Sequence, residues 1–505
     1  MPTYSKFKRP RIELNQRLLL ATNVFDLLSE EHDCFAYQKI FKDIDTSSIE
    51  NKYHHLGQHA YHPTLMVSIL IYAYSNGVFS SREIERHCHQ DLAFMYISQN
   101  NCPNFRVLGD FRKNNLKFFH DCFKLSVKMA IDLQMASLGH ISLDGSKFKA
   151  NSSKHKAMSY GRLKAKESKL TEEIEGLTKK ACKCDAEENK DYLEQSGYSI
   201  SDDLAFKQNR LNTMSTAKIA LEKREAEINP EQPIADKKQI SFTDYDARIM
   251  KTKGGYEYSY NPQISVDKDQ QIIVGQHVSQ NANDLQEVEP ALAAITDATD
   301  GHLINEMSLD NGYNSGSNLD ALNKANIDAY VATDRQEKPD INALEHSDRK
   351  FVKADFIYLE EEDNFQCPGG EKLTTAPDSK AKKKTYKANK NICQECVYKS
   401  RCYSSKKRPG RIIQTDKHEA LRQTMNKRMA TAQAQKRYDA RKITVEPAFG
   451  HIKNSGFRGF SLRGIKKVAG EFSLMCAAYN FKKMVRAGMA GSIHLKNENR
   501  SLYVG

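Results

Sequence analysis

Apolar residues recur at helical spacing through much of the first third of the chain. In residues 62–77, Pro63 stands where the first turn of a helix needs no N–H donor, and Gly77 closes the apolar run. Residues 108–134 repeat the helical spacing over a longer segment. We therefore predict a helical N-terminal domain, suited to binding DNA, over residues 1–135.

The pattern changes to that of β-strands after this domain. Ile141 and Leu143 alternate with polar residues in a strand that ends at Asp144, and residues 256–279 alternate on both sides of a turn, as a β-hairpin does. After a helical segment, an apolar run from Leu303 reads as a buried strand that ends at Asp310. Strand, hairpin, helix and strand in this order predict a mixed α/β core.

Two insertions interrupt this predicted core. Residues 155–239 are highly charged, and their leucines at near-heptad spacing predict a hairpin of two helices, with a disordered charged linker as the alternative. Residues 351–412 form a basic segment that contains a cluster of cysteines. We expect residues 486–505 to be a flexible polar tail. The core then consists of residues 136–154, 240–350 and 413–485.

The charge balance points to a polyanionic partner. The 505 residues include 76 Lys and Arg against 64 Asp and Glu, which gives a formal net charge of +12. Such a surplus concerns partners and solubility more than fold. The sequence has no apolar run long enough to cross a membrane and no signal peptide at its start. We expect a soluble, cytoplasmic protein.

Three carboxylates are candidates for a metal site. Asp144 and Asp310 each follow an apolar strand, and ligands of α/β sheets gather at the carboxyl ends of strands, although aspartate is also a common turn residue. Glu446 directly precedes Pro447, and we expect a new helix to begin near Thr444 with the proline in its first turn. Together the carboxylates would suit Mg²⁺ or Mn²⁺, which prefer oxygen ligands.

Basic and aromatic residues surround the third of these carboxylates. Glu446 and Lys453 share one face of the predicted helix, about 10 Å apart, and Gly450 between them leaves room for a sugar–phosphate backbone. Tyr438 and Arg441 lie shortly upstream. An ordinary exposed ion pair is the alternative, and it would contribute little.

The segments ISLDG, EMSLDNGY and TVEPAFGHIK, in this order, resemble the DDE transposases of bacterial insertion sequences. The likeness extends over most of residues 50–485. The family signature around the glutamate is Y-x2-R-x3-E-x6-K, which Tyr438, Glu446 and Lys453 match. The gap between arginine and glutamate is one residue longer here, so Arg441 and Lys442 are both candidates for the arginine position.

The resemblance implies a ribonuclease-H-like core in which Asp144, Asp310 and Glu446 are catalytic and hold two Mg²⁺ or Mn²⁺ ions. It implies DNA binding by Tyr438 and by the basic residues Arg441, Lys442 and Lys453. The expected activity is that of a dimeric, nucleoid-associated transposase, which binds the terminal inverted repeats of its element, cleaves its ends and joins them to target DNA. The alternatives are a nuclease of the same fold without strand transfer and a non-catalytic DNA-binding regulator.

Four of the 11 cysteines are spaced as in a zinc site. Cys367, Cys393, Cys396 and Cys402 follow the pattern C-x25-C-x2-C-x5-C, and the sequence after Cys367 resembles a zinc-knuckle turn. Four thiolates can complete a tetrahedral structural Zn²⁺ site, which leaves no open position for catalysis. We predict a small zinc-knuckle-like insertion, with unmetallated thiols as the alternative.

Overall fold

The computed structural model describes residues 23–53, 60–153, 156–187, 200–228, 230–333, 349–376, 384–403 and 410–488. The chain divides into two compact units, residues 1–112 with 484–505 and residues 113–483. Most of the predicted polar tail, from residue 489 onward, lies outside the described residues. Where the chain is described, no helix combines the length and apolar character needed to span a membrane.

The N-terminal region is helical, as predicted. Its central helix, α3 (Pro63–Ser75), is buried along almost its whole length, with the proline in its first turn. Buried Arg112 donates a hydrogen bond of 2.8 Å to the hydroxyl of Tyr74 on this helix. The other elements are η1 (Val24–Leu27), α1 (Asp33–Phe41), α2 (Ser47–Glu50), α4 (Ser81–Gln90), α5 (Leu92–Ile97) and α6 (Phe105–Asn114). The helix α7 (Leu116–Asp132), which the sequence prediction included here, lies in the second unit.

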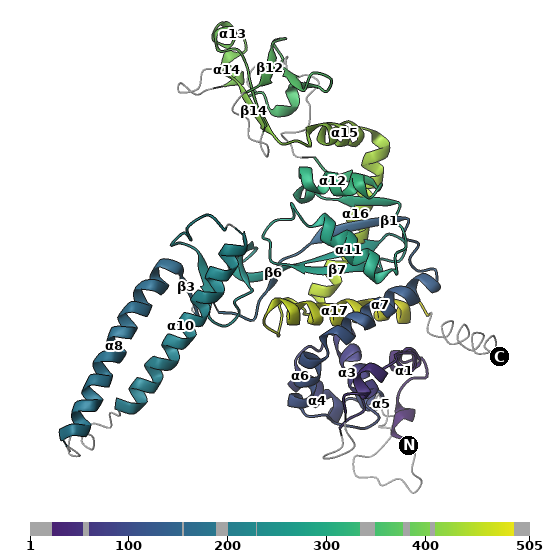
Figure 1. The fold of residues 1–505 in the computed structure, drawn as a ribbon. Helices are drawn as coiled ribbons and strands as arrows, with labels where there is room; N and C mark the ends of the chain where they lie inside the picture. Colours follow the sequence, from purple (N-terminus) through teal and green to yellow (C-terminus); the bar gives the residue numbers. More distant parts are fainter. Residues whose placement is uncertain are drawn as a thin grey trace, which may run out of the picture. The chain divides into compact units, whose positions relative to one another are not determined.

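A mixed seven-stranded sheet forms the centre of the second unit (Figure 1). β1 is antiparallel to β6 and parallel to β8, β8 is parallel to β9, and β6 pairs with β7 as the predicted hairpin. The short strands β2 and β5 also pair with β6. The bounds are β1 (His140–Gly145), β2 (Phe148–Lys149), β5 (Arg248–Thr252), β6 (Gly255–Asp267), β7 (Ile273–Ser279), β8 (Glu306–Leu309) and β9 (Asp328–Val331).

One end of a predicted strand is corrected by the structure. β8 begins at Glu306, and Leu303, which we expected inside the buried strand, is 89% exposed. Leu303 lies in the connection that follows α11 (Val288–Ala298), where the chain turns back toward the sheet. The mixed α/β core itself is confirmed.

Helices from several parts of the chain pack on this sheet. α11 contacts β7, while α16 (Ala432–Asn454) contacts β1, β6, β8 and β9. α17 (Ile465–Arg486) is joined to β7 through Asn480, whose side chain accepts from the backbone N–H of Ile273 at 3.0 Å and donates to its carbonyl at 2.9 Å. α12 (Gly316–Lys324) and α15 (Glu419–Met429) contact each other beside β9.

The predicted helix start near Thr444 is wrong, because α16 runs without a break from Ala432 to Asn454 with Pro447 inside it. A proline cannot donate the hydrogen bond that the carbonyl four residues earlier normally accepts. That carbonyl belongs to Ile443, and the side-chain amide of Gln271 donates to it at 2.7 Å. A residue from the turn between β6 and β7 thus replaces the missing donor.

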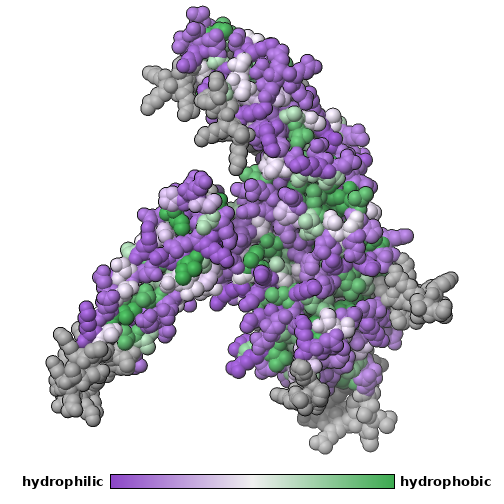
Figure 2. Space-filling view, in the orientation of Figure 1, coloured by the Kyte–Doolittle hydropathy of each residue, from purple (hydrophilic) through white to green (hydrophobic). Residues whose placement is uncertain are grey.

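The first predicted insertion contains two long helices, α8 (Tyr160–Glu187) and α10 (Ile200–Ile228), which pack against each other (Figure 1). Leucines of both helices, with Met214 and Ala217, form their buried seam. The strands β3 (Ala157–Ser159) and β4 (Gln239–Ser241) pair at its base. Figure 2 shows isolated hydrophobic residues on an otherwise hydrophilic surface here, and Phe206 and Ile219 are both exposed.

The second predicted insertion contains a small antiparallel sheet that the sequence analysis did not anticipate. Its core includes Phe365 and Tyr386, which contact each other edge to face at 5.0 Å. Its strands are β10 (Ile357–Leu359), β11 (Asn364–Gln366), β12 (Lys372–Thr375), β13 (Lys384–Lys387) and β14 (Ile412–Thr415). The helices α13 (Lys390–Glu395) and α14 (Lys399–Cys402) lie between β13 and β14 in the sequence. Because β14 pairs with β13, the sheet extends beyond the predicted boundary at residue 412.

Candidate active site

Two of the predicted carboxylates lie at the carboxyl ends of adjacent strands inside the sheet. β1 and β8 are parallel neighbours, with Leu143 opposite Leu309, so Asp144 and Asp310 follow a paired position on adjacent strands. The carboxylate of Asp310 also accepts a hydrogen bond of 2.8 Å from the backbone N–H of Gly312, which fixes the turn after β8. The parallel pairing therefore brings together two acids that are far apart in the sequence.

α16 adds the third carboxylate and a cation. The Nη2 atom of Arg441 lies 2.9 Å from Oδ1 of Asp144 and 3.9 Å from Oδ2 of Asp310. Its Nη1 atom lies 3.3 Å from Oε1 of Glu446 on the same helix. One guanidinium group thus contacts all three predicted site carboxylates.

The structure also distinguishes the two candidates for the basic position of the signature. The side chain of Arg441 is 8% exposed and points to the carboxylates, whereas that of Lys442 is 67% exposed and pairs with Asp439 at 3.1 Å. Consecutive residues of a helix point in different directions, which explains why only one of them reaches the site. Arg441 is the basic residue at the three acids.

The charges of Asp144, Asp310 and Arg441 influence one another's pKa values. Burial raises the pKa of Asp144 to about 6; Arg441 opposes this shift and Asp310 adds to it. Burial alone would lower the pKa of Arg441, but the charges of Asp144 and Asp310 hold the pKa above its usual value. The guanidinium therefore stays charged and compensates the cluster of acids.

A fourth carboxylate, which the sequence analysis missed, lies beside this group. Oδ1 of Asp284 accepts hydrogen bonds of 2.7 Å from the side-chain amides of Asn261 and Gln263 on β6. Lys147 lies 3.8 Å from the same oxygen. The charge of Asp284 contributes to the raised pKa of Asp144. Asp284 follows the second strand of the hairpin, and this position after a strand was the only signal available in the sequence.

Lys453 also reaches the site, from the end of α16. Its ammonium group donates a hydrogen bond to the hydroxyl of Ser146, in the loop directly after Asp144, and lies 5.1 Å from the ring centroid of Phe148. Burial lowers the pKa of Lys453. Gly450, one turn earlier on the helix, has nothing within 4 Å of the position of a Cβ atom. The helix is therefore open beside the lysine.

Tyr438 is half-buried on the same helix. Burial raises the pKa of its hydroxyl, the charge of Arg441 opposes the shift and that of Asp310 adds to it. Of the four residues predicted to bind DNA, the structure thus places three, Tyr438, Arg441 and Lys453, around the acids.

The donor set at the acids fits a hard divalent cation in its chemistry, since it consists of carboxylate oxygens. In the described arrangement these oxygens face the guanidinium of Arg441. Within the described ranges, no group of three or more His, Cys, Asp or Glu side chains is arranged to hold a metal ion.

The same finding leaves the predicted zinc site without support. Cys367, Cys393, Cys396 and Cys402 are free thiols of intermediate exposure. Cys367 and Cys396 lie close together, because a Cβ atom on Gly369 would lie 3.6 Å from both of their sulfurs. Burial raises the pKa of Cys402 to about 11, and the other three thiols add to this shift. Zinc binding by these residues stays a prediction.

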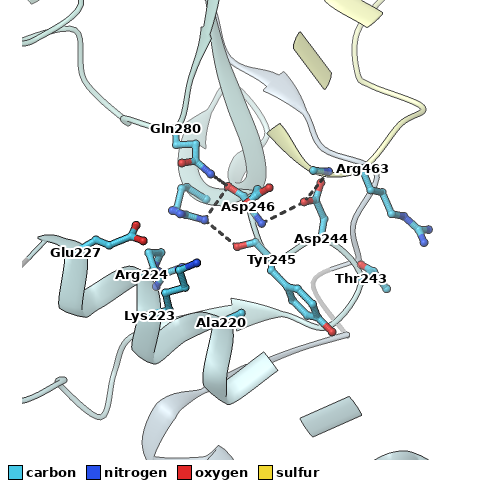
Figure 3. A pocket seen from close by; sticks show the side chains of 12 residues that line it. Ala220, Lys223, Arg224, Glu227, Thr243, Asp244, Tyr245, Asp246, Gln280 and Arg463 are labelled. Atoms are coloured by element: carbon cyan, nitrogen blue, oxygen red, sulfur yellow. Dashed lines mark hydrogen bonds between the residues drawn. The ribbon is translucent and has the colours of Figure 1, made fainter. Parts of the chain in front are cut away.

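A cavity of about 490 Å³ lies at the base of the α8–α10 hairpin and is lined by a separate set of residues (Figure 3). Arg248 donates from Nη1 to three backbone carbonyls of its own loop. Asp244 and Asp246 accept from the backbone N–H groups of Gly464 and Ile465, at 3.2 and 2.9 Å. These polar groups hold the loop to the start of α17, which is a structural role.

Two segments of the chain match known protein families. Residues 366–485, which include Glu446, match a transposase DDE domain, and residues 23–114 match a transposase domain (DUF772). Asp144 and Asp310 lie outside both matched segments. Comparison with the curated proteins and with the solved structures gives no match.

Proposed function

Because the chain matches two transposase family models, as its resemblance to the transposases of bacterial insertion sequences predicted, we propose that it is a DDE transposase. It binds the terminal inverted repeats of its element, cleaves the element ends and joins them to target DNA by divalent-metal-dependent phosphoryl transfer. The observation that carries the proposal is the convergence of Asp144, Asp310 and Glu446 on one guanidinium group.

The proposed core is ribonuclease-H-like. The strand order β7-β6-β1-β8-β9, with β6 antiparallel to both of its neighbours and β1, β8 and β9 parallel, supports this assignment. In this order the two aspartates stand at the carboxyl ends of the adjacent strands β1 and β8, and the glutamate lies on a helix that packs across them. Ligands of such sheets bind at the carboxyl ends of strands.

In this proposal Asp144, Asp310 and Glu446 hold two Mg²⁺ or Mn²⁺ ions. When bound, such a pair activates the attacking oxygen and stabilises the leaving one. The protein's own contribution is to position the phosphodiester and to offset its charge. In this proposal the half-buried Lys453, beside Phe148, and the half-buried Tyr438 hold phosphates near the acids.

The proposed partner is double-stranded DNA, bound by a homodimer at the bacterial nucleoid. The net charge of +12 supports binding to a polyanion. Contacts to phosphates would make the affinity fall steeply with salt concentration. The open surface at Gly450, between Glu446 and Lys453, gives the backbone of DNA a close approach to α16.

We also propose that the cysteine cluster of the second insertion takes up one structural zinc ion. The proposal rests on the spacing of the four cysteines and on the proximity of the sulfurs of Cys367 and Cys396 around Gly369. The aromatic core around Phe365 would then be one of two elements that hold this small sheet together.

The proposed function is tested with the variants Asp144→Asn, Asp310→Asn and Glu446→Gln. Cleavage of duplexes that carry the element ends, measured with Mn²⁺, is expected to fall at least about 100-fold in each variant. Binding of the same duplexes, measured by fluorescence anisotropy, is expected to change little. Asp439→Asn is the matched control, because Asp439 is an exposed acid on the same helix that pairs only with Lys442 in the described contacts.

Two results would contradict the proposal. Equal loss of cleavage and binding in the amide variants would give the acids a structural role. Cleavage by the wild-type protein without joining of pre-cut ends to target DNA would assign the chain as a nuclease.

A further inference from the structure

We propose that Arg441 occupies the metal site of the DNA-free protein as a resident cation, and that DNA releases it so that divalent ions can enter. This inference rests on the proposed function, since it concerns the same three carboxylates. It adds a regulatory role for a residue that the family signature associates with DNA contact. It also predicts how metal affinity depends on DNA.

The contacts of Arg441 are those of a counter-ion at the centre of the site. Its two terminal nitrogens contact Asp144, Asp310 and Glu446, three acids supplied by two strands and one helix. The side chain of Arg441 is 8% exposed, whereas those of Asp310 and Glu446 are 39% and 53% exposed, so water offsets the charges of these two acids only in part. The neighbouring Lys442 has the same charge but pairs with an exposed acid elsewhere.

A guanidinium and a divalent cation cannot share these oxygens. Both need the lone pairs of the same carboxylates, and two positive charges a few ångströms apart repel each other where water screens them incompletely, as it does beside the buried side chain of Arg441. Entry of Mg²⁺ or Mn²⁺ therefore requires Arg441 to leave. The free energy needed to break its contacts lowers the affinity of the DNA-free protein for metal.

DNA offers Arg441 a replacement for the carboxylates. Guanidinium groups bind phosphate oxygens with two parallel hydrogen bonds, a geometry that lysine cannot reproduce. The Nε atom of Arg441 is buried and has no hydrogen-bond partner among the described residues, so the group's donors are not all used in this arrangement. A phosphate beside α16 would satisfy more of them.

The exchange couples the two ligands reciprocally. If DNA removes the cation that competes with metal, DNA raises the affinity for metal, and metal raises the affinity for DNA by the same factor. Free protein would then hold divalent ions poorly and would not cut DNA before the substrate is in place. An ion pair with a purely structural role would produce no such coupling.

The experiment measures Mn²⁺ binding to the full-length protein by electron paramagnetic resonance of the free ion, with and without a short DNA duplex. Arg441→Gln is compared with Lys442→Gln, which removes the same charge from the next residue. Without DNA, Arg441→Gln is expected to bind Mn²⁺ at least about tenfold more tightly than wild type, and Lys442→Gln as wild type does. DNA is expected to tighten Mn²⁺ binding to wild type and to Lys442→Gln, but not to Arg441→Gln.

A second variant keeps the test decisive if Arg441→Gln does not fold. Arg441→Lys retains the positive charge and is expected to bind Mn²⁺ as weakly as wild type does in the absence of DNA. Equal Mn²⁺ affinity with and without DNA in the wild-type protein would overturn the inference while leaving the metal site itself intact. Absence of Mn²⁺ binding in every protein, with DNA present, would instead overturn the proposed function and the inference together.

Discussion

The side-chain amide of Gln271 donates a hydrogen bond of 2.7 Å to the backbone carbonyl of Ile443, the acceptor that Pro447 leaves without its usual helical donor. The turn between β6 and β7 thereby secures α16 next to Glu446, the residue that directly precedes the proline. A proline that weakens the helix thus coincides with the position of a proposed metal ligand. We therefore expect local helix stability and the placement of the glutamate to be in conflict.

Pro447→Ala tests this conflict. Alanine restores an N–H donor for Ile443 and removes the clash of the proline ring, so the unfolding free energy is expected to rise by about 1–3 kcal/mol. A shift of the helix at this position would displace Glu446, so cleavage of element ends is expected to fall at the same time. Urea denaturation and the cleavage assay measure the two effects. Reduced stability with unchanged cleavage would show that Pro447 does not position the glutamate.

Gly450→Ala probes whether DNA approaches α16. No atom lies within 4 Å of the position of the new Cβ, so the substitution is expected to stabilise the helix by about 1 kcal/mol. A sugar–phosphate backbone lying close to the glycine would be pushed away, and DNA affinity is expected to fall severalfold. DNA affinity equal to that of wild type would place the DNA elsewhere.

Gly275→Ala is the contrasting control for this glycine. Its Cβ would lie 2.6 Å from Cγ1 of Ile295 and 3.2 Å from the backbone of α11, so β7 and the helix would be forced apart. This variant is expected to lose about 1–3 kcal/mol of stability. Any loss of DNA binding should then follow the loss of folded protein.

The sequence was sufficient to predict the parts of the fold that depend on local patterns. Apolar and polar residues alternate before Asp144, and a glycine follows it, so a strand end was predictable. Asp310 follows an apolar run in the same way. Their adjacency required the parallel pairing of β1 with β8, which only the order of elements suggested.

The parts that the sequence did not reveal depend on partners distant in the chain. The donor for Ile443 comes from Gln271, so no local rule could predict that α16 continues past Pro447. Asp284 lies in a loop without periodicity, and its role follows only from its contacts with β6. The strands around Phe365 are three or four residues long and mostly polar, too short to give an alternating pattern.

Lys453→Gln is expected to weaken DNA binding without changing sequence preference. Removal of one phosphate contact should lower the slope of log affinity against log salt concentration by about 1. Lys324→Gln is the matched control, because Lys324 pairs with Asp320 on the exposed surface of α12. An unchanged slope for Lys453→Gln would show that its ammonium group, bonded to Ser146, is structural.

The cysteine cluster is tested by metal analysis. The purified protein is expected to contain about one zinc ion per chain, and Cys393→Ser with Cys396→Ser is expected to abolish it. Elemental analysis by mass spectrometry measures the content, and thermal unfolding of chelator-treated protein measures the consequence. A zinc-free protein whose unfolding is insensitive to chelator would show that the core around Phe365 and Tyr386 suffices.

We expect Asp267, at the end of β6, to contribute to the pH dependence of the unfolding free energy. Its carboxylate is fully buried and accepts backbone N–H groups of Leu138 and Asp269, each at 2.9 Å. Burial raises its pKa to about 6, although these hydrogen bonds oppose the shift. Between pH about 4 and about 6, the folded protein therefore keeps a proton that the unfolded chain has released.

It follows that the contribution of Asp267 to the unfolding free energy falls as the pH rises through this window, by up to about 3 kcal/mol. Asp267→Asn cannot titrate, so the difference in stability between wild type and this variant is expected to shift across the window and to level off above it. Asp269→Asn removes a neighbouring negative charge that adds to this shift, so it should lower the pKa of Asp267 and narrow the pH window. Urea denaturation at a series of pH values measures all three profiles. A difference between wild type and Asp267→Asn that is the same at every pH would contradict the buried, proton-binding carboxylate.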